Sequence, residues 1–148
     1  MAAPRTATPE MIKAANPPAG FEPIISNSAF GWENGPIFEK KGPGGCRRGF
    51  RVAERHINAG GVCHGGMMMT FADILLATAV MEVAEPPFVT IRLTTDFINA
   101  AQLGEWVEGE AIASGVEDGV VPVSCVMKVA ERTVASASGL FKLLGSRR

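Results

Sequence analysis

Residues 67–83, MMMTFADILLATAVMEV, decide how this chain of 148 residues folds. They are almost all apolar and include good helix formers, and Glu85-Pro86-Pro87 ends the run. A helix that is apolar nearly all round must be buried on most of its sides. We therefore predict a central helix that the rest of the chain encloses.

The segments around this helix predict strands. Residues 37–41 and 46–55 flank Gly42-Pro43-Gly44-Gly45, whose turn residues indicate a hairpin. Strand-like segments follow the helix at residues 88–99, 105–115, 120–130 and 132–144, with the hairpin dipeptide Asp118-Gly119 before the third. One buried helix with five to six antiparallel strands is an α+β architecture, in which the sheet curls around the helix.

The first strand after the helix alternates between apolar and polar side chains, which predicts two distinct faces. The expected faces are Val89, Ile91 and Leu93 on one side and Thr90, Arg92 and Thr94 on the other.

The beginning of the chain predicts an arm that lies over the domain. Thr8-Pro9-Glu10 supplies a capping hydroxyl, a proline at the first helical position and an acid in the first turn. Asn16-Pro17-Pro18 keeps the resulting helix short. Residues 21–36 predict irregular structure. We expect an arm at residues 1–27 and one domain at residues 28–148.

Composition excludes several classes of function. The net charge of -1 gives no basic surface for nucleic acid or for an anionic membrane. The three cysteines form no C-x-x-C pair, which disfavours a disulfide framework and a zinc ribbon. Reduced thiols and the lack of a secretory signal pattern favour a cytoplasmic location. A membrane span needs about 20 apolar residues, and residues 67–83 fall short of that and contain an acid.

Asp73 is the anomaly of the central helix, because Phe71-Ala72 and Ile74-Leu75-Leu76 flank it. An ionised carboxylate is rarely buried without a partner. It lies too far from the start of the helix to act as a cap. Asp73 is therefore a catalytic carboxylate, half of an ion pair with a structural arginine, or a side chain that emerges through a gap in the sheet.

His64-Gly65-Gly66 precedes the helix and supplies the second candidate feature. The free amides of a first helical turn stabilise developing negative charge, as an oxyanion hole does, and glycine lets a ligand approach closely. A tight turn from loop to helix is the simpler alternative. Gly65 and Asp73 are eight residues apart, hence roughly 12 Å along one helix. A joint site would therefore need a second copy of the chain across a two-fold axis.

These residues together resemble a known family. Asn58-x-x-Gly61-x-x-His64-Gly65-Gly66, followed by Phe71-Ala72-Asp73, is similar to the signature of hotdog-fold thioesterases of the phenylacetate-degradation (PaaI-like) branch. The resemblance runs from about residue 34 to residue 141, and the order of strands agrees with it.

The resemblance implies a role for each matching position. The Gly65 amide would polarise the thioester carbonyl with help from the Asn58 side chain. Asp73 of the partner subunit would act as nucleophile or general base, and the Thr90 hydroxyl would orient the water. The substrate would be an acyl-CoA, with no metal or redox cofactor, and the protein would be a homodimer, often paired into a tetramer.

Further residues are candidates for contact with the substrate. His64, which more simply orders its loop, and Gly66 lie in the motif, and Met69 could line the acyl pocket. Arg92 is a candidate for the nucleotide half of CoA, as are Lys142 and Arg147-Arg148.

Other classes of function stay open. A hotdog hydratase or dehydratase would usually need a histidine paired with an acid, and a non-catalytic acyl-CoA binding module would not need Asp73. The chain has no Gly-x-Ser-x-Gly elbow. A Cys63–His64 nucleophile pair and a metal site made by His56, Cys63 and His64 are both disfavoured by their spacing. The sequence does not specify the acyl group.

Overall fold

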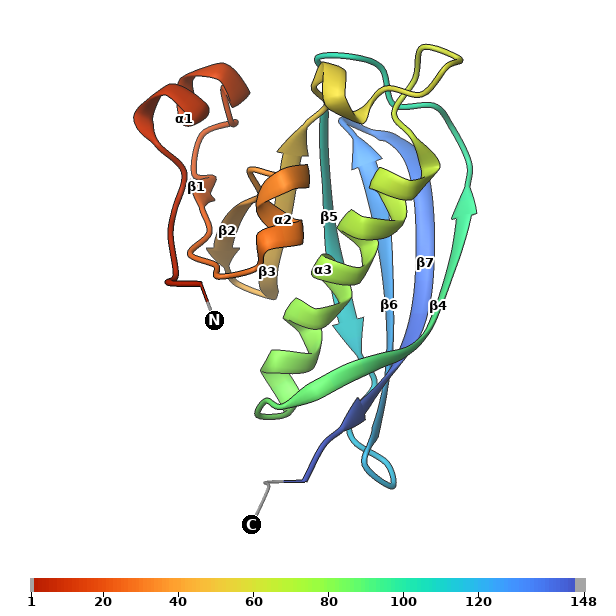
Figure 1. The fold of residues 1–148 in the computed structure, drawn as a ribbon. Helices are drawn as coiled ribbons and strands as arrows, with labels where there is room; N and C mark the ends of the chain where they lie inside the picture. Colours follow the sequence, from red (N-terminus) through yellow and green to blue (C-terminus); the bar gives the residue numbers. More distant parts are fainter. Residues whose placement is uncertain (1, 146–148) are drawn as a thin grey trace.

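The computed structural model describes residues 2–145. Its helices and strands follow one another as α1 (Pro9–Ala15), β1 (Glu22–Pro23), α2 (Ala29–Asn34), β2 (Phe38–Gly42), β3 (Gly45–Arg51), η1 (Glu54–His56), α3 (Gly65–Val83), β4 (Phe88–Phe97), β5 (Trp106–Ala113), β6 (Val120–Val129) and β7 (Arg132–Leu143) (Figure 1). The strands form one sheet in the order β1-β2-β3-β5-β6-β7-β4, and every neighbouring pair is antiparallel. The expected α+β class is confirmed, with seven strands in place of five to six because the two-residue β1 adds an edge.

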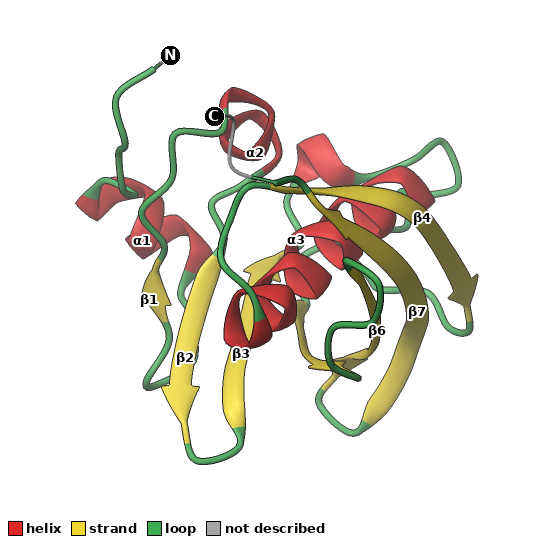
Figure 2. Ribbon diagram, turned by 90° about the horizontal axis from the view of Figure 1, so that it is seen from below, coloured by secondary structure: helices red, strands yellow, loops and turns green. Residues whose placement is uncertain are grey.

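The long helix α3 lies in the curl of this sheet (Figure 2). Phe71, Leu75 and Leu76 are fully buried in the main core, which also takes side chains from β3, β5, β6 and β7. Two glycines in the sheet allow α3 to lie close to it. A Cβ at Gly109 would come within 2.7 Å of Leu75, and one at Gly139 within 3.2 Å of Leu76.

One side of α3 stays uncovered. Met69, Met81 and Val83 are exposed, so the helix is buried over only part of its circumference.

The argument from length against a membrane span was wrong, because α3 begins at Gly65 and is long and apolar enough to cross one by these two criteria alone. Half of its most apolar stretch is nevertheless buried inside the fold, and the core helix of a soluble protein passes the same test.

The edge strand β4 differs from its expected alternation. The register shifts between Thr90 and Arg92, so Ile91 is an extra residue in the ladder. Thr90 pairs with Phe141 and Leu93 with Gly139, two positions on the same face of β7. Thr90 and Leu93 therefore share the face that carries α3, and the predicted grouping of Leu93 with Val89 and Ile91 was wrong. Sequence periodicity does not reveal a bulge, which depends on the pairing with β7.

Two local expectations between residues 21 and 55 were also wrong. The segment expected to be irregular contains β1 and the helix α2, whose cap is the Ser28 side chain accepting from the Gly31 N–H at 3.0 Å. The Trp32 indole N–H donates to the Ser26 carbonyl at 2.9 Å and fixes this turn. The strand expected to reach residue 55 ends at Arg51, and η1 follows it.

The arm packs on the outer face of the sheet. The expected helix is confirmed as α1, with Thr8 accepting from the Met11 N–H and Asn16 in the left-handed region at its end. Trp106 forms the centre of a second apolar cluster with Ala15, Phe21 and Phe38. The Trp106 ring lies over Gly49, where an added Cβ would be 2.4 Å from the ring. The division at residues 27 and 28 itself stays a prediction.

Candidate active site at the start and middle of the central helix

The loop before α3 is ordered by its own polar side chains. The Asn58 Oδ1 accepts from the Gly60 N–H at 2.9 Å and from the Val62 N–H at 3.3 Å. His64 caps α3, because its Nδ1 accepts from the Gly66 N–H at 2.7 Å. The neutral His64 that accepts through Nδ1 carries its proton on Nε2. The Asn58 side-chain oxygen therefore accepts two hydrogen bonds, while its NH2 group donates none among the described residues. The Gly66 N–H is already bonded to His64 and is not free for a substrate.

The Gly65 amide is different from its neighbours. Its N–H makes no hydrogen bond with any residue in the range 2–145. It is the first residue of a 19-residue helix, so the positive end of the helix dipole coincides with this free donor. The Phe97 ring lies against Gly65, and a Cβ there would be 3.2 Å from Phe97 Cζ. The arrangement offers one unshared N–H to an acceptor with partial negative charge.

Asp73 lies on the side of α3 that the sheet leaves uncovered, and it is half-buried rather than fully buried as the sequence suggested. The Thr90 hydroxyl donates to its Oδ1 at 2.7 Å, a short bond of the kind that carboxylates accept. Within the described part of the chain Asp73 forms no ion pair. The structural salt bridge considered above therefore has no counterpart here. Thr90 reaches this carboxylate because its pairing with Phe141 turns it to the face of β4 that carries α3.

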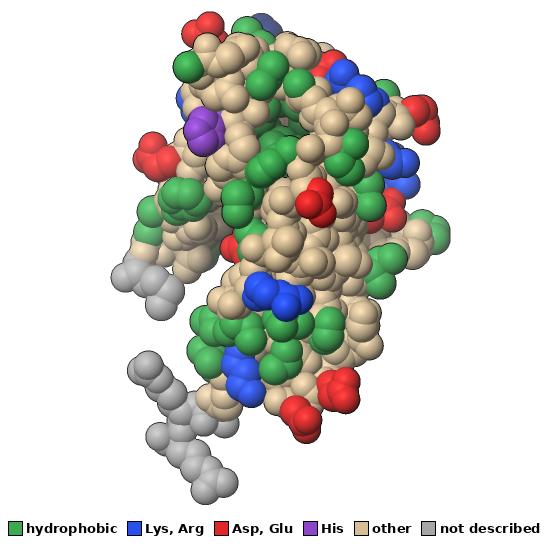
Figure 3. All heavy atoms as spheres, turned by 90° about the vertical axis from the view of Figure 1, so that its right-hand side faces the viewer, with side chains coloured by type: hydrophobic (Ala, Val, Ile, Leu, Met, Phe, Trp, Pro, Cys, Tyr) green, Lys and Arg blue, Asp and Glu red, His purple; other side chains and the backbone are tan. Residues whose placement is uncertain are grey.

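The same side of the molecule has exposed apolar side chains and a free strand edge. β4 is at the end of the sheet formed by the described strands, so no strand among them pairs with its outer edge. Ile91 and Phe97 on β4 are about half exposed, as is Met69 on α3 to a smaller extent. Figure 3 shows apolar side chains gathered on this face. Such a surface is typical of an interaction site.

Not every candidate lies together with Asp73. Arg92 pairs with Leu140, next to the inward Thr90–Phe141 pair, so it belongs to the opposite face of β4. Lys142 donates to the Asp118 carbonyl at 3.2 Å. Arg147 and Arg148 lie outside the described residues. The roles of Arg92 and Met69 stay predictions.

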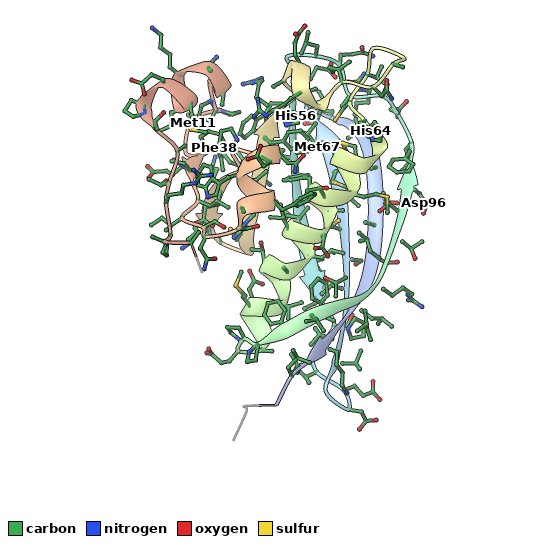
Figure 4. All side chains as sticks on the ribbon, viewed as in Figure 1. Met11, Phe38, His56, His64, Met67 and Asp96 are labelled. Carbon is green, nitrogen blue, oxygen red and sulfur yellow. The ribbon has the colours of Figure 1, made fainter. Side chains whose placement is uncertain are left out.

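His56 and Cys63 have structural surroundings. His56 is buried beside the start of α3, near His64 (Figure 4). Its Nδ1 accepts from the Ala53 N–H, its Nε2 bonds to the Asn34 carbonyl at 2.9 Å, and burial lowers its pKa. Burial raises the pKa of Cys63 to about 11, so this thiol is a poor nucleophile near neutral pH. In residues 2–145 no cluster of three His, Cys, Asp or Glu side chains could hold a metal ion.

Two residues near the site were missed from the sequence. Phe97 contacts Gly65 only because β4 runs back along α3. Arg48 points towards α3, and its alternation with buried Phe50 on β3 was the signal that could have revealed it.

Comparison with known proteins agrees with this arrangement. A family model described as the thioesterase superfamily matches residues 60–136, which span the loop, α3 and most of the strands after it. The chain is 35% identical over 138 residues to PA0474 of Pseudomonas aeruginosa, a protein whose name proposes that it is an esterase. That match covers 86% of this chain and 98% of the relative. The chain belongs to the thioesterase superfamily.

Solved structures define the fold more closely. The PaaI protein from the phenylacetic acid degradation operon of E. coli superimposes with a TM-score of 0.70 over 80% of this chain and 86% of that one, at 22% identity. The smu.793 protein of Streptococcus mutans, solved bound to acetyl CoA, has a TM-score of 0.62 over 71% and 85% at 19% identity. These identities support the fold alone. The expected hotdog fold and the resemblance to PaaI-like proteins are confirmed.

Proposed function

We propose that this protein is an acyl-CoA thioesterase that hydrolyses its substrate to a free acid and CoA. The observation that carries the proposal is that one helix has both a Gly65 N–H without a hydrogen-bond partner in residues 2–145 and a half-buried carboxylate, Asp73. Membership of the thioesterase superfamily supports the reaction class. The acetyl CoA bound by the Streptococcus mutans protein of similar fold supports CoA as the carrier.

The residues have complementary roles in this proposal. The Gly65 N–H donates to the thioester carbonyl oxygen and stabilises the negative charge that forms there, with the Asn58 NH2 group as a second donor. Asp73 either attacks the carbonyl carbon, expelling the CoA thiolate and forming a mixed anhydride that water then hydrolyses, or removes a proton from a water that attacks this carbon and displaces the thiolate. Thr90 holds the carboxylate by its hydrogen bond and orients the water. The thiolate of CoA is a good leaving group, so the proposed reaction uses no metal or redox cofactor.

The proposed site is shared between two subunits. Gly65 and Asp73 are separated by about 12 Å along α3, whereas both groups must come within about 3 Å of the reacting atoms. A two-fold dimer through the free edge of β4 would bring Asp73 of one protomer towards Gly65 of the other, and it would cover Val89 and Ile91. We propose a homodimer with two such sites, which could pair further into a tetramer.

The test is a thiol-release assay of the purified protein on a panel of acyl-CoAs, with Asp73→Asn and Asp73→Ala as variants. We expect the wild type to hydrolyse at least one member and both variants to lose most of that turnover while keeping their melting temperatures. Full turnover in Asp73→Asn would remove this carboxylate from the mechanism. Binding of acyl-CoA without turnover of any member would favour the non-catalytic module.

The hydratase alternative is disfavoured by the histidines. His56 bonds to backbone groups of Ala53 and Asn34, and His64 bonds to the Gly66 N–H. Neither ring meets a carboxylate in the described part of the chain, so the acid-paired histidine of that reaction has no candidate here.

A further inference from the structure

The edge strand β4 carries one positive and one negative side chain on its outer face. Arg92 pairs with Leu140 and Asp96 with Ser136 on β7, so both lie on the face of the sheet that is turned away from α3. Both are exposed, Asp96 near the end of the strand (Figure 4), and neither forms an ion pair with any residue in the range 2–145. Two such charges on a strand edge suit a neighbouring strand that presents the same charges in reverse order.

The backbone groups at this edge limit how a second strand can pair with it. The Ile98 N–H donates to the Val134 carbonyl of β7, and the N–H groups of successive strand residues point to opposite sides. The N–H of Thr94 therefore also points to β7, while those of Leu93 and Thr95 point to the free edge. A second β4 across a two-fold axis would pair antiparallel through these free groups, and side chains that lie opposite each other would share a face.

The charges distinguish among the registers that keep the two faces matched. Near the middle of β4 these registers place the two-fold axis at Leu93, Thr94 or Thr95. The axis at Thr94 puts Arg92 of each protomer directly opposite Asp96 of the other. An axis at Leu93 puts Arg92 opposite Thr94, and an axis at Thr95 puts it opposite a residue beyond the end of β4. Only the axis at Thr94 therefore opposes each charge with the opposite charge.

The same register assembles the proposed shared site on the inner face. Ile91 is an extra residue in the ladder, so Thr90 occupies the next regular position after that of Arg92. With the axis that pairs the charges, this position is opposite Phe97 of the other protomer. Thr90 bonds to Asp73, while Phe97 lies against Gly65. The charges and the site are on opposite faces of β4, and both require the same axis.

We infer that β4 pairs with β4 of a second copy about a two-fold axis at Thr94, and that Arg92 and Asp96 form two symmetric ion pairs that fix this register. The inference rests on the proposed function, which requires a shared site. A slip of the register by two residues keeps every side chain on its own face, so polarity alone does not prevent it. The ion pairs disfavour such a slip, because it separates Arg92 from Asp96. Arg92 thus acts at the dimer interface rather than on CoA.

The first test locates the axis with single cysteines, and it measures disulfide-linked dimers on non-reducing gels after mild oxidation. With the axis at Thr94, the two copies of this residue form a non-hydrogen-bonded pair with Cα atoms about 4.5 Å apart, which a disulfide can bridge. We expect Thr94→Cys to link. Arg92→Cys and Asp96→Cys should not link alone, because identical positions are then about 13 Å apart, but they should link when refolded together. The wild type, with its partly exposed Cys46, is the control.

The second test exchanges the charges and measures the dissociation constant of the dimer by sedimentation. Arg92→Asp places two carboxylates opposite each other at both ends of the interface, and Asp96→Arg does the same with two guanidinium groups. Each change should raise Kd by about tenfold or more at low salt. The double variant with both changes restores the two ion pairs, so its Kd should return to within about threefold of the wild-type value.

Several results would overturn this register. Self-linking of Leu93→Cys or Thr95→Cys in place of Thr94→Cys would move the axis to that residue. A chain that links at none of these positions, or a double charge variant that dimerises no better than the single variants, would also contradict the inference. Turnover of an acyl-CoA together with any of these results keeps the proposed function and removes the register. Linking at Thr94 without turnover of any acyl-CoA keeps the register and removes the function.

Discussion

Replacing Gly65 by proline should remove the proposed oxyanion donor and leave α3 intact. Gly65 is the first residue of the helix, where proline is well accepted because that N–H has no place in the helical ladder. His64 before it has φ -61° and ψ 135°, in the region that a residue preceding proline prefers. The new Cβ would be 3.2 Å from the Phe97 ring, which is 56% exposed and can shift slightly.

The expected effect is large on catalysis and small on stability. Loss of one oxyanion-hole donor costs about 10²–10³ in kcat, or ~2.7–4 kcal/mol of transition-state stabilisation. The Gly65 N–H makes no hydrogen bond in residues 2–145, so folding loses none. We expect the melting temperature to change by less than about 4 °C, which corresponds to about 1 kcal/mol in a domain of this size.

Gly65→Ala is the matched control, because it places the same Cβ against Phe97 and keeps the N–H. Both variants are compared with the wild type by thiol release and by thermal unfolding. Equal activity of Gly65→Pro and Gly65→Ala would refute the role of the amide.

Equimolar refolding of Gly65→Pro with Asp73→Asn should restore about a quarter of wild-type activity, since about half of the dimers are then mixed and each has one intact site. No recovery in stable mixed dimers would refute the shared site.

Three further predictions concern single residues. Thr90→Val removes the 2.7 Å hydrogen bond to Asp73 and should lower kcat by about tenfold or more at nearly constant melting temperature; an unchanged kcat would contradict the positioning role. Gly49→Ala places a Cβ 2.4 Å from the packed Trp106 ring, and urea unfolding should show a loss of about 1–3 kcal/mol. Burial lowers the pKa of His56, so the folded state binds fewer protons than the unfolded state. The free energy of unfolding should therefore be full above about pH 6.5 and fall as the pH drops below it, a slope that His56→Gln should reduce.

The features that the sequence predicted correctly are those that local signals encode. The cap at Thr8 and the stop at Asn16-Pro17-Pro18 bound α1, and the apolar run from residue 67 fixes the type of α3. The four strands after α3 begin and end within two residues of their predicted limits. Capping, turn chemistry and periodicity act over short distances, so one segment carries the whole signal.

The features that the sequence missed depend on pairing between distant segments. The bulge at Ile91 exists only in the ladder with β7, and it reverses the face on which Leu93 lies. The inward position of Arg48 depends on the position of β3 under α3, beside Glu39 of β2. The alternation with Phe50 gives the face of β3 on which Arg48 lies, but its partner Glu39 comes from another strand and is not encoded locally.

The sequence by itself determined that a helix carries Asp73 eight residues after Gly65, and that both lie in the region that matches the thioesterase superfamily. Only the tertiary structure decided what surrounds them. Among residues 2–145 it leaves the Gly65 N–H without a hydrogen bond, brings Thr90 to Asp73, and leaves this side of α3 and the edge of β4 uncovered. The physical reason is that residue type and spacing along a helix are local properties. Hydrogen-bond partners and exposure, in contrast, are set by the pairing of strands far apart in the chain.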